Sequence, residues 1–269
     1  MSDRAISSNE MTDNRARVTM AGLSDKGLRR SVNQDHIGFN QELGIAVLAD
    51  GMGGHRAGEV AAQMAVETVL DELQKLMLQQ IPGSITSSQL LEFLSHTISD
   101  SNRSIYQAAE ADEDHKGMGT TLVAAVIEGS VLHVGHVGDS RLYLYREKTL
   151  TRITKDHSLA QDLIDKGFYT EDEARDANVG HVVTRALGSK HDIEVDTLQQ
   201  ELLEKDLLLM CSDGLTDMVP EWQIAEVIAD HGNDLELVAK KLVSLANSYG
   251  GRDNISIILT QLNTESSGK

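Results

Sequence analysis

Four aspartates stand at the ends of short apolar runs, where carboxylate side chains could be brought together to do chemistry. They are Asp50, Asp139, Asp213 and Asp253. The first three follow runs typical of β-strands, and Asp253 directly precedes another such run. Taken singly, each aspartate fits an ordinary turn, because Asp is common where a strand ends.

Taken together, the four carboxylates predict a metal site. Strand ends in a layered sheet protein lie along one rim, so these charges would repel one another unless cations neutralise them or some carboxyls stay protonated. Oxygen ligands select hard ions such as Mg²⁺ or Mn²⁺ over zinc. Two such ions about 3.5–4 Å apart form the arrangement used for in-line phosphoryl chemistry. Gly51 lets the backbone turn tightly after Asp50, so a main-chain carbonyl can also serve as a ligand.

Other catalytic patterns are poorly supported. His133 and His136 are three residues apart on an expected strand, so they point to opposite faces and cannot chelate one ion together. The sequence has no Cys-x-x-Cys, His-Glu-x-x-His or Gly-x-Ser-x-Gly motif. The glycines of 51–58 match neither the dinucleotide-binding pattern nor the P-loop, because no Gly-Lys-Ser/Thr follows them.

Composition narrows the range of partners. The chain of 269 residues has 42 acidic and 24 basic side chains, a net charge of −18, which argues against nucleic acid or an anionic membrane as a partner. An anionic substrate therefore needs a few local cations. The single cysteine, Cys211, excludes an intrachain disulfide, and its apolar surroundings favour an inert buried thiol. With neither a membrane-length apolar run nor a signal-peptide pattern, we expect a cytoplasmic protein.

The hydrophobic pattern predicts one domain over 16–262, between polar tails at 1–15 and 263–269. Apolar residues recur with helical spacing in 58–78, 88–109, 220–230 and 234–248. Short apolar runs predict strands at 17–24, 36–40, 43–49, 119–128, 131–138, 141–146, 194–199, 206–211 and 254–262. Strands therefore come in clusters separated by paired helices, which predicts a layered α+β fold with mostly antiparallel sheets. The polar stretch 155–190, with two short helical segments, is expected to be a surface excursion.

Six motifs resemble those of PPM (PP2C-like) metal-dependent serine/threonine phosphatases of the bacterial type. The segment 30–35 resembles the opening R-x-x-N-x-D motif, and 49–55 resembles the D-G-M-G-G signature. The remaining motifs follow in the family's order at 119–122, 137–141, 211–215 and 252–256. The resemblance covers about residues 17–262. It implies a four-layer αββα sandwich of two antiparallel sheets flanked by helix pairs, with 155–190 as a flap involved in substrate choice.

The resemblance also implies a set of metal ligands. Asp50 would bridge two Mn²⁺ or Mg²⁺ ions, and the Gly51 carbonyl would bind the second of them. Asp213 and Asp253 would bind the first ion. Asp139 and Asp213 would serve a weaker third metal site.

Three further roles follow from the same motifs. Asp35 would hold water at the metals, and Arg30 would bind the substrate phosphate. His55 is a candidate catalytic residue, because Met52 stands where many eukaryotic members have the histidine assigned as general acid. Gln34 stands where those members have Glu, which removes a charged contact at the second metal.

More ordinary interpretations stay open for several of these residues. Arg30 lies in a basic stretch that could be a solvated surface, and Arg29 is the neighbour with which it could be confused. His55 could simply be a polar residue at a helix start. Thr120 and Thr121 are expected to be packing residues on a strand beneath the site.

The expected activity is hydrolysis of phosphoserine and phosphothreonine in proteins by direct attack of water activated between two metal ions. Phosphorylated proteins, including a cognate serine/threonine kinase, would be its partners, and a monomer is expected. The alternatives are a catalytically weak module that binds phosphoproteins, a phosphatase for small phosphate esters, and a scaffold whose aspartates only form turns.

Overall fold

Two antiparallel sheets form the centre of the molecule in a computed structural model, which describes residues 18–54, 57–81, 83–170, 173 and 182–263. The first sheet has the order β1-β11-β10-β7-β8 and the second the order β2-β3-β5-β6-β9, with β4 paired to β3. The strands are β1 (Val18–Asp25), β2 (Asp35–Asn40), β3 (Ile45–Met52), β4 (Gly119–Thr120), β5 (Leu122–Glu128), β6 (Val131–Val137), β7 (Arg141–Arg146), β8 (Thr149–Arg152), β9 (Asp196–Glu201), β10 (Leu207–Cys211) and β11 (Ile255–Leu262).

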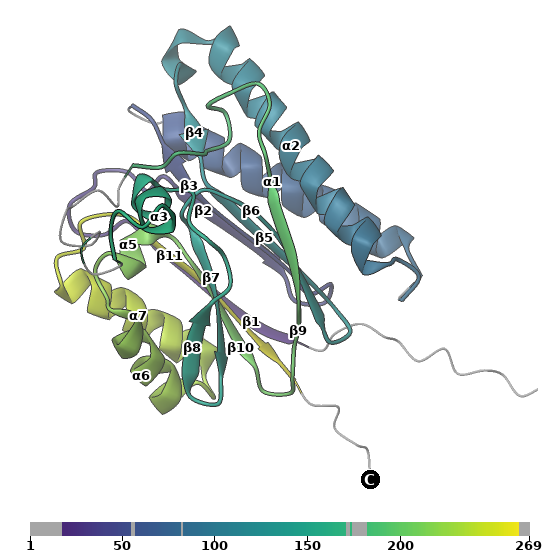
Figure 1. The fold of residues 1–269 in the computed structure, drawn as a ribbon, viewed down its shortest axis with the longest axis vertical. Helices are drawn as coiled ribbons and strands as arrows, with labels where there is room; N and C mark the ends of the chain where they lie inside the picture. The colour runs from purple at the N-terminus through teal and green to yellow at the C-terminus, as the bar shows by residue number, and fades with distance from the viewer. Residues whose placement is uncertain (1–17, 55–56, 82, 171–172, 174–181, 264–269) are drawn as a thin grey trace, which may run out of the picture.

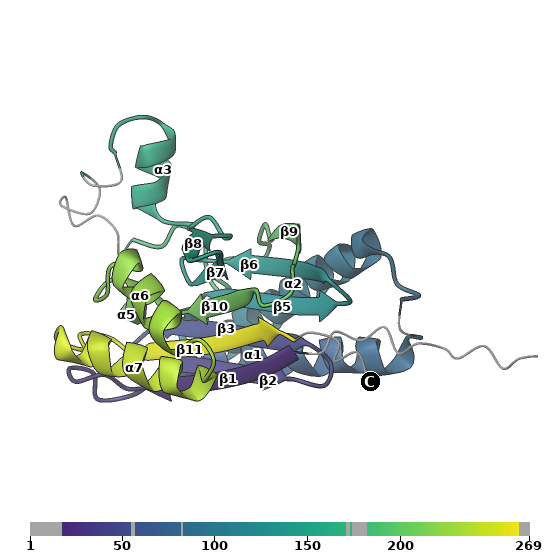
Figure 2. The ribbon, with the colours of Figure 1, turned by 90° about the horizontal axis from the view of Figure 1, so that it is seen from below.

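Helices cover the outer face of each sheet, as Figures 1 and 2 show. The helices α1 (Ala57–Gln79) and α2 (Ser87–Ala111) pack on the second sheet through one apolar cluster. The helices α6 (Glu221–His231) and α7 (Leu235–Ser248) pack on the first sheet through another. A third cluster fills the space between the sheets. The prediction of an α+β sandwich of two antiparallel sheets between helix pairs is therefore confirmed.

The four long helices follow the periodicity of the sequence to within about two residues. Helix α2 begins with a capping box, in which Thr86 and Gln89 satisfy each other's backbone N–H groups. The Asp234 side chain accepts a hydrogen bond from Leu237 N at the start of α7. Short polar caps therefore fix where the apolar stripes begin.

Two short elements and one interruption differ from the sequence prediction. Strand β8 follows a tight turn in which Glu147 and Lys148 have positive φ angles, and its four residues lack a continuous apolar face. The one-turn helix α5 (Asp213–Thr216) begins directly after β10. The strand expected over 119–128 is two strands that meet at Thr121. Elements this short carry too few residues to show a period.

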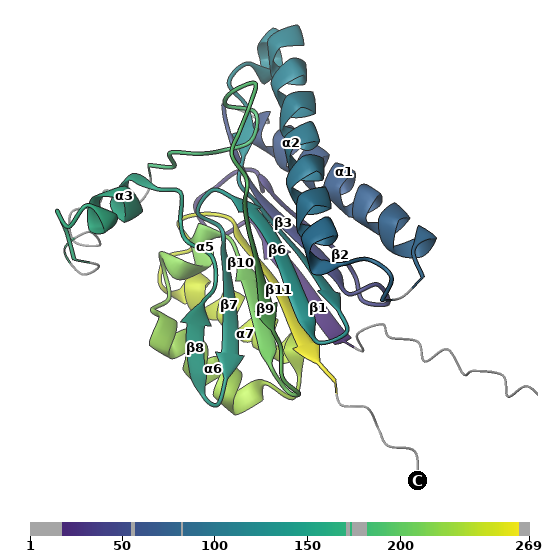
Figure 3. The same cartoon turned by 45° about the vertical axis from the view of Figure 1, so that its right-hand side comes forward.

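Only part of the segment 155–190, expected to be a surface excursion, projects from the sandwich, as Figure 3 shows; Leu187 near its end is buried and exchanges backbone hydrogen bonds with Thr120. The helix α3 of this segment (Leu159–Asp165) begins at Ser158, whose side chain accepts a hydrogen bond from Gln161 N. The second helical stretch that we expected here lies mostly outside the described residues. None of the helices in the described part of the chain has the length and apolar character that crossing a bilayer requires.

Candidate active site

Five aspartates from distant parts of the chain meet at one end of the sandwich. They are Asp35, Asp50, Asp139, Asp213 and Asp253. Asp35 and Asp50 are direct partners across the β2–β3 pair, so their side chains share a face. On β3 this face is that of Ala46 and Leu48, which pack between the two sheets. The space between the sheets is thus apolar along most of its length and acidic at this end.

Hydroxyl groups from the β4–β5 junction hold the backbone of Asp50. Thr121 Oγ1 accepts a hydrogen bond from Asp50 N at 3.0 Å, and Thr120 Oγ1 donates one to Asp50 O at 2.9 Å. The Thr121 hydroxyl also lies 2.7 Å from that of Ser140, beside Asp139. The two threonines, expected only to pack beneath the site, therefore also position its central aspartate.

Asp35 is buried and only half satisfied. Ser212 Oγ donates to its Oδ2 at 2.8 Å, while Oδ1 is buried without a hydrogen-bond partner in the described structure. Burial raises the pKa of Asp35 to about 6, although hydrogen bonds from Ser256 and Ser212 oppose this shift. An unpartnered carboxylate oxygen at this position is able to accept a hydrogen bond from water.

Four of the five aspartates have no ion pair with a cation of the described chain. Burial, followed by the charges of neighbouring aspartates, raises the pKa of both Asp50 and Asp213 well above the ordinary value. Burial and then the Asp156 charge raise the pKa of Asp139 to about 6. Asp253 alone of the five has an ion pair with a described residue, at 2.5 Å from Arg30. A buried acidic group of this kind fits hard divalent cations.

One carboxylate oxygen of Asp213 lacks a hydrogen-bond partner. Its Oδ1 is buried and has no partner in the part of the chain that the structure describes. Asp213 lies in the first turn of α5, where its backbone carbonyl accepts a hydrogen bond from Thr216 Oγ1 at 3.4 Å. Its side chain is thus free to act as a ligand, and the residues present fit a metal.

Gly51 lies where the chain passes very close to the start of α1. A Cβ atom at this position would stand 2.1 Å from the carbonyl oxygen of Gly58. Only glycine therefore fits without moving the backbone. Gly51 N also donates to the Gln34 carbonyl oxygen at 3.2 Å, which ties the end of β3 to the segment before β2.

Arg30 lies at the edge of the site and is half exposed, with 50% of its side-chain surface accessible. Its Nη2 atom bonds to Asp253 Oδ2, so the arginine is neither remote from the carboxylates nor a purely solvated charge. Asn254 fixes the loop that carries Arg30, because its Nδ2 atom donates to the carbonyls of Lys26 and Val32 at 2.9 and 3.0 Å.

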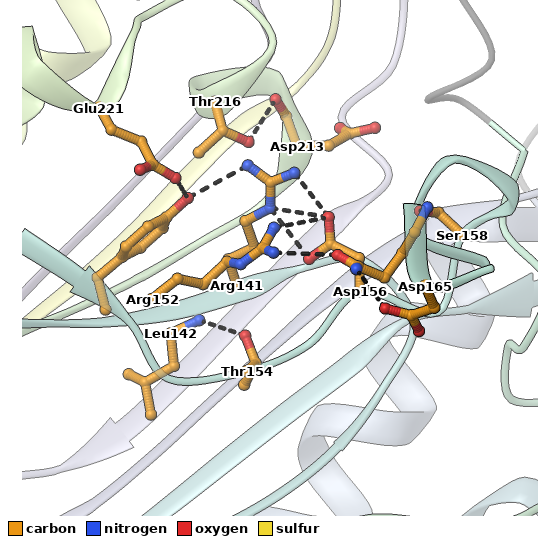
Figure 4. A network of polar contacts seen from close by, with 12 residues as sticks. Arg141, Leu142, Arg152, Thr154, Asp156, Ser158, Asp165, Asp213, Thr216 and Glu221 are labelled. Atoms are coloured by element: carbon orange, nitrogen blue, oxygen red, sulfur yellow. Dashed lines mark hydrogen bonds and ion pairs between the residues drawn. The ribbon is translucent and has the colours of Figure 1, made fainter. Parts of the chain in front are cut away.

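A second polar network adjoins the aspartates and is drawn in Figure 4. Arg141 binds Asp156 with both Nε and Nη2, at distances from 2.6 to 3.1 Å. Arg152 approaches the same carboxylate at 3.5 Å. On its other side Arg141 donates to Tyr143 Oη, which donates to Glu221 at 2.9 Å. Nothing in the sequence spacing indicated this pairing.

His136, His157 and Asp196 form another compact group, with ligand atoms within 4.8 Å of one another. Gly138 N–H donates to His157 Nδ1 at 3.0 Å, and His157 Nε2 lies 3.3 Å from Asp196 and 3.1 Å from Arg185 Nη1. Arg185 also pairs with Asp196, at 2.6 Å. Within the described structure, His136 Nδ1 is buried and has no hydrogen-bond partner, so this group is not fully satisfied by the protein.

The candidate site residues predicted from the sequence thus fall into two sets. The structure brings together Arg30 and the five aspartates, with Gly51 next to Asp50. His55 lies outside the described residues. Sequence reasoning assigned no role to the hydroxyl side chains of Ser140, Ser212 and Ser256, although each lies within one of the motifs at 137–141, 211–215 and 252–256.

Comparison with known proteins decides the family. A protein-family model described as protein phosphatase 2C matches residues 28–248. The chain belongs to the protein phosphatase 2C family. The predicted resemblance is therefore confirmed, and this chain is a serine/threonine phosphatase of the metal-dependent class.

Individual members of the protein phosphatase 2C family match this chain over nearly their whole length. The serine/threonine phosphatase stp of Listeria innocua is 37% identical over 249 residues, which cover 91% of this chain and 96% of that protein. The protein phosphatase PhpP of Streptococcus pneumoniae is 36% identical, with 90% and 97% covered. The solved structure of the Mycobacterium tuberculosis phosphatase PstP/Ppp has a TM-score of 0.82 at 36% identity, covering 92% of this chain and 99% of its own. Another structure of the PstP catalytic domain, with a TM-score of 0.80, contains two manganese ions.

Proposed function

We propose that this chain hydrolyses phosphoserine and phosphothreonine in proteins at a centre of two Mn²⁺ or Mg²⁺ ions. The observation that carries the proposal is the aspartate cluster, in which the pKa values of Asp35, Asp50, Asp139 and Asp213 are raised. In the described structure one carboxylate oxygen each of Asp35 and Asp213 is buried without a partner. The two ions, when bound, lower the pKa of a water molecule and offset the charge of the phosphate oxygens. In this proposal Asp50 would serve both ions, Asp213 and Asp253 would hold the first, and the Gly51 carbonyl would hold the second.

The remaining side chains have separate tasks in the proposal. Asp35 orients water through its unpartnered Oδ1, while Ser212 keeps its other oxygen fixed. Arg30 exchanges its contact with Asp253 for a contact with the substrate phosphate when metal neutralises that carboxylate. Its guanidinium can hold two phosphate oxygens, so it orients the ester for in-line displacement. His55 remains a candidate for protonating the leaving oxygen.

The proposal extends to the setting of the enzyme. A third ion would bind weakly between Asp139 and Asp213. The substrates would include proteins phosphorylated by a cognate serine/threonine kinase, and the enzyme would act as a cytoplasmic monomer. The catalytic domain would span 16–262, with 155–190 as the flap and the residues on either side as tails.

Hydrolysis of a phosphothreonine peptide with and without Mn²⁺ tests this function. We expect turnover that requires the metal and is abolished by EDTA, and binding of Mn²⁺ measured by calorimetry. The same assay on para-nitrophenyl phosphate distinguishes a phosphatase for small esters. Binding of phosphopeptide without turnover would instead indicate a module that only recognises phosphoproteins.

A further inference from the structure

Two loops that lie far apart in the sequence form one exposed surface beside Arg30. The first is 26–33, between β1 and β2, and the second is 249–254, between α7 and β11; Figure 1 places both at the same end of the molecule. The carbonyl of Gly251 accepts hydrogen bonds from Leu28 N and Arg29 N at 2.8 and 3.1 Å. The two loops therefore form one body next to the proposed phosphate-binding arginine.

Glycines make this body rigid. A Cβ atom on Gly27 would stand 2.1 Å from the carbonyl oxygen of Asp253, and one on Gly251 would stand 2.9 Å from Leu28 N. Both glycines have positive φ angles, 74° and 48°. The chain has thus packed backbone against backbone at this place, where any side chain would push the loops apart. The orientation of the surface relative to Asp253 is fixed as a result.

The surface carries positive charge on a strongly negative protein. Lys26, Arg29 and Arg252 are exposed, and none of them has an ion pair or side-chain hydrogen bond with a described residue. Arg30 stands among them and is already paired with Asp253. Since the whole chain has a net charge of −18, a group of cations beside the acidic site creates a local field of opposite sign.

Apolar side chains interrupt the charges. Leu28 is 66% exposed although its backbone N–H is bonded to the Gly251 carbonyl, and Tyr249 is 46% exposed. The Tyr249 hydroxyl donates to Gln223 Oε1 at 2.9 Å, which ties the ring to α6. Exposed leucine and tyrosine on a rigid loop lose little conformational entropy when a partner covers them.

We propose that Lys26, Leu28, Arg29, Tyr249 and Arg252, named the docking rim, bind the peptide segment next to the phosphorylated residue and select segments with acidic side chains. This inference rests on the proposed function, because it assumes that the phosphate lies at Arg30. The cations of the docking rim attract the acidic side chains, and Leu28 and Tyr249 cover an apolar side chain of the same segment. In this proposal these two loops, which lie outside the flap, determine part of the enzyme's specificity for substrate sequence.

The docking rim can be tested with two phosphothreonine peptides. One peptide has three acidic residues beside the phosphothreonine, and the other has three lysines at the same positions. With Mn²⁺ at low salt, we expect kcat/KM for the acidic peptide to exceed that for the basic one by on the order of tenfold, a preference that added salt reduces. Arg29→Glu and Arg252→Glu should each remove most of this preference. Leu28→Ser should raise KM for both peptides relative to para-nitrophenyl phosphate.

Lys241→Glu is the matched control, because Lys241 is an exposed residue of α7 and the substitution changes the net charge equally. Equal turnover of the two wild-type peptides would overturn the docking rim, as would an equal loss of preference in Lys241→Glu. Absence of Mn²⁺-dependent turnover of every ester, including para-nitrophenyl phosphate, would contradict the proposed function and the docking rim together. The two failures are therefore distinguishable.

Discussion

Two groups of buried carboxylates lie close together in this protein, and they differ in what neutralises them. Asp156, with 7% of its side-chain surface exposed, accepts hydrogen bonds from Arg141 and approaches Arg152. Asp50 and Asp213 have no cation from the described chain, and burial together with mutual repulsion raises their pKa values. The charge of Asp156 is neutralised by arginines of the protein itself. Asp50 and Asp213 need cations from solution to remain ionised at little cost. A buried carboxylate is thus informative about function when its counter-charge is missing.

Substitutions that remove a ligand without changing shape should separate the two groups most sharply. Asp213→Asn should lower kcat for a phosphothreonine peptide by roughly 10³-fold or more at saturating Mn²⁺, because the metal no longer gains a charged ligand. Steady-state kinetics across a Mn²⁺ titration measures this. Asp230→Asn makes the same chemical change at an exposed position of α6 and should have no comparable effect. Unchanged, metal-dependent turnover in Asp213→Asn would remove the proposed chemistry.

Removing the carboxylate of Asp156, which pairs with arginine, should lower the stability of the protein. Asp156→Ala leaves the Arg141 guanidinium without its carboxylate, which should lower the free energy of unfolding by about 3–5 kcal/mol. Urea denaturation should give this loss both in EDTA and with Mn²⁺, since the network needs no metal. A loss that appears only with Mn²⁺ present would assign Asp156 to the metal site and contradict the comparison.

The unpaired group should destabilise the metal-free protein. Asp50→Asn removes a buried charge that like charges repel, so it should raise the free energy of unfolding in EDTA at pH 8 by about 1–3 kcal/mol while abolishing activity. Thermal denaturation in EDTA, compared with wild type, measures this. If Asp50→Asn were as destabilising as Asp156→Ala, the two groups would be electrostatically alike.

The pH dependence of stability follows from the same cause. Burial raises the folded-state pKa values of Asp35 and Asp139 to about 6, above the ordinary value of 3.8 that an aspartate has in the unfolded chain. The folded state therefore binds more protons between these values, and the stability of the metal-free protein should fall as pH rises from about 4 through 6. Melting temperatures in EDTA should decline over this range, and Mn²⁺ should reverse the decline at neutral pH.

The smallest expected effect comes from adding a carboxylate. Gln34→Glu places a charged oxygen beside Asp35 and the proposed second metal, so half-maximal activity should need several-fold less Mn²⁺, worth about 1 kcal/mol. A Mn²⁺ titration of activity measures this. Gln34→Met is the uncharged control, and an equal shift in both variants would indicate a steric cause.

The sequence alone predicted most of the layers and the meeting of the aspartates, because both depend on where apolar periods begin and end. It could not predict how Asp50 is held, because the motifs containing Thr121 and Ser140 do not show which hydroxyl contacts which backbone or side-chain atom once the strands have packed. The pairing of Arg146 with Asp206, like that of Arg141 with Asp156, depends on strand register, which local pattern does not determine. Elements of four residues, β8 and α5, were missed for want of a period.

The pairing of β1 with β11 has a consequence for the synthesis of the protein. Strand β1 joins its sheet only through β11, and Arg30 meets Asp253 across 223 residues of sequence. On the ribosome, a nascent chain complete through β10 has no place for β1 and no fixed loop for Arg30. The arginine and the carboxylates become a single site only when the β11 segment leaves the exit tunnel. The active site is therefore complete only once β11 has joined the sheet beside β1.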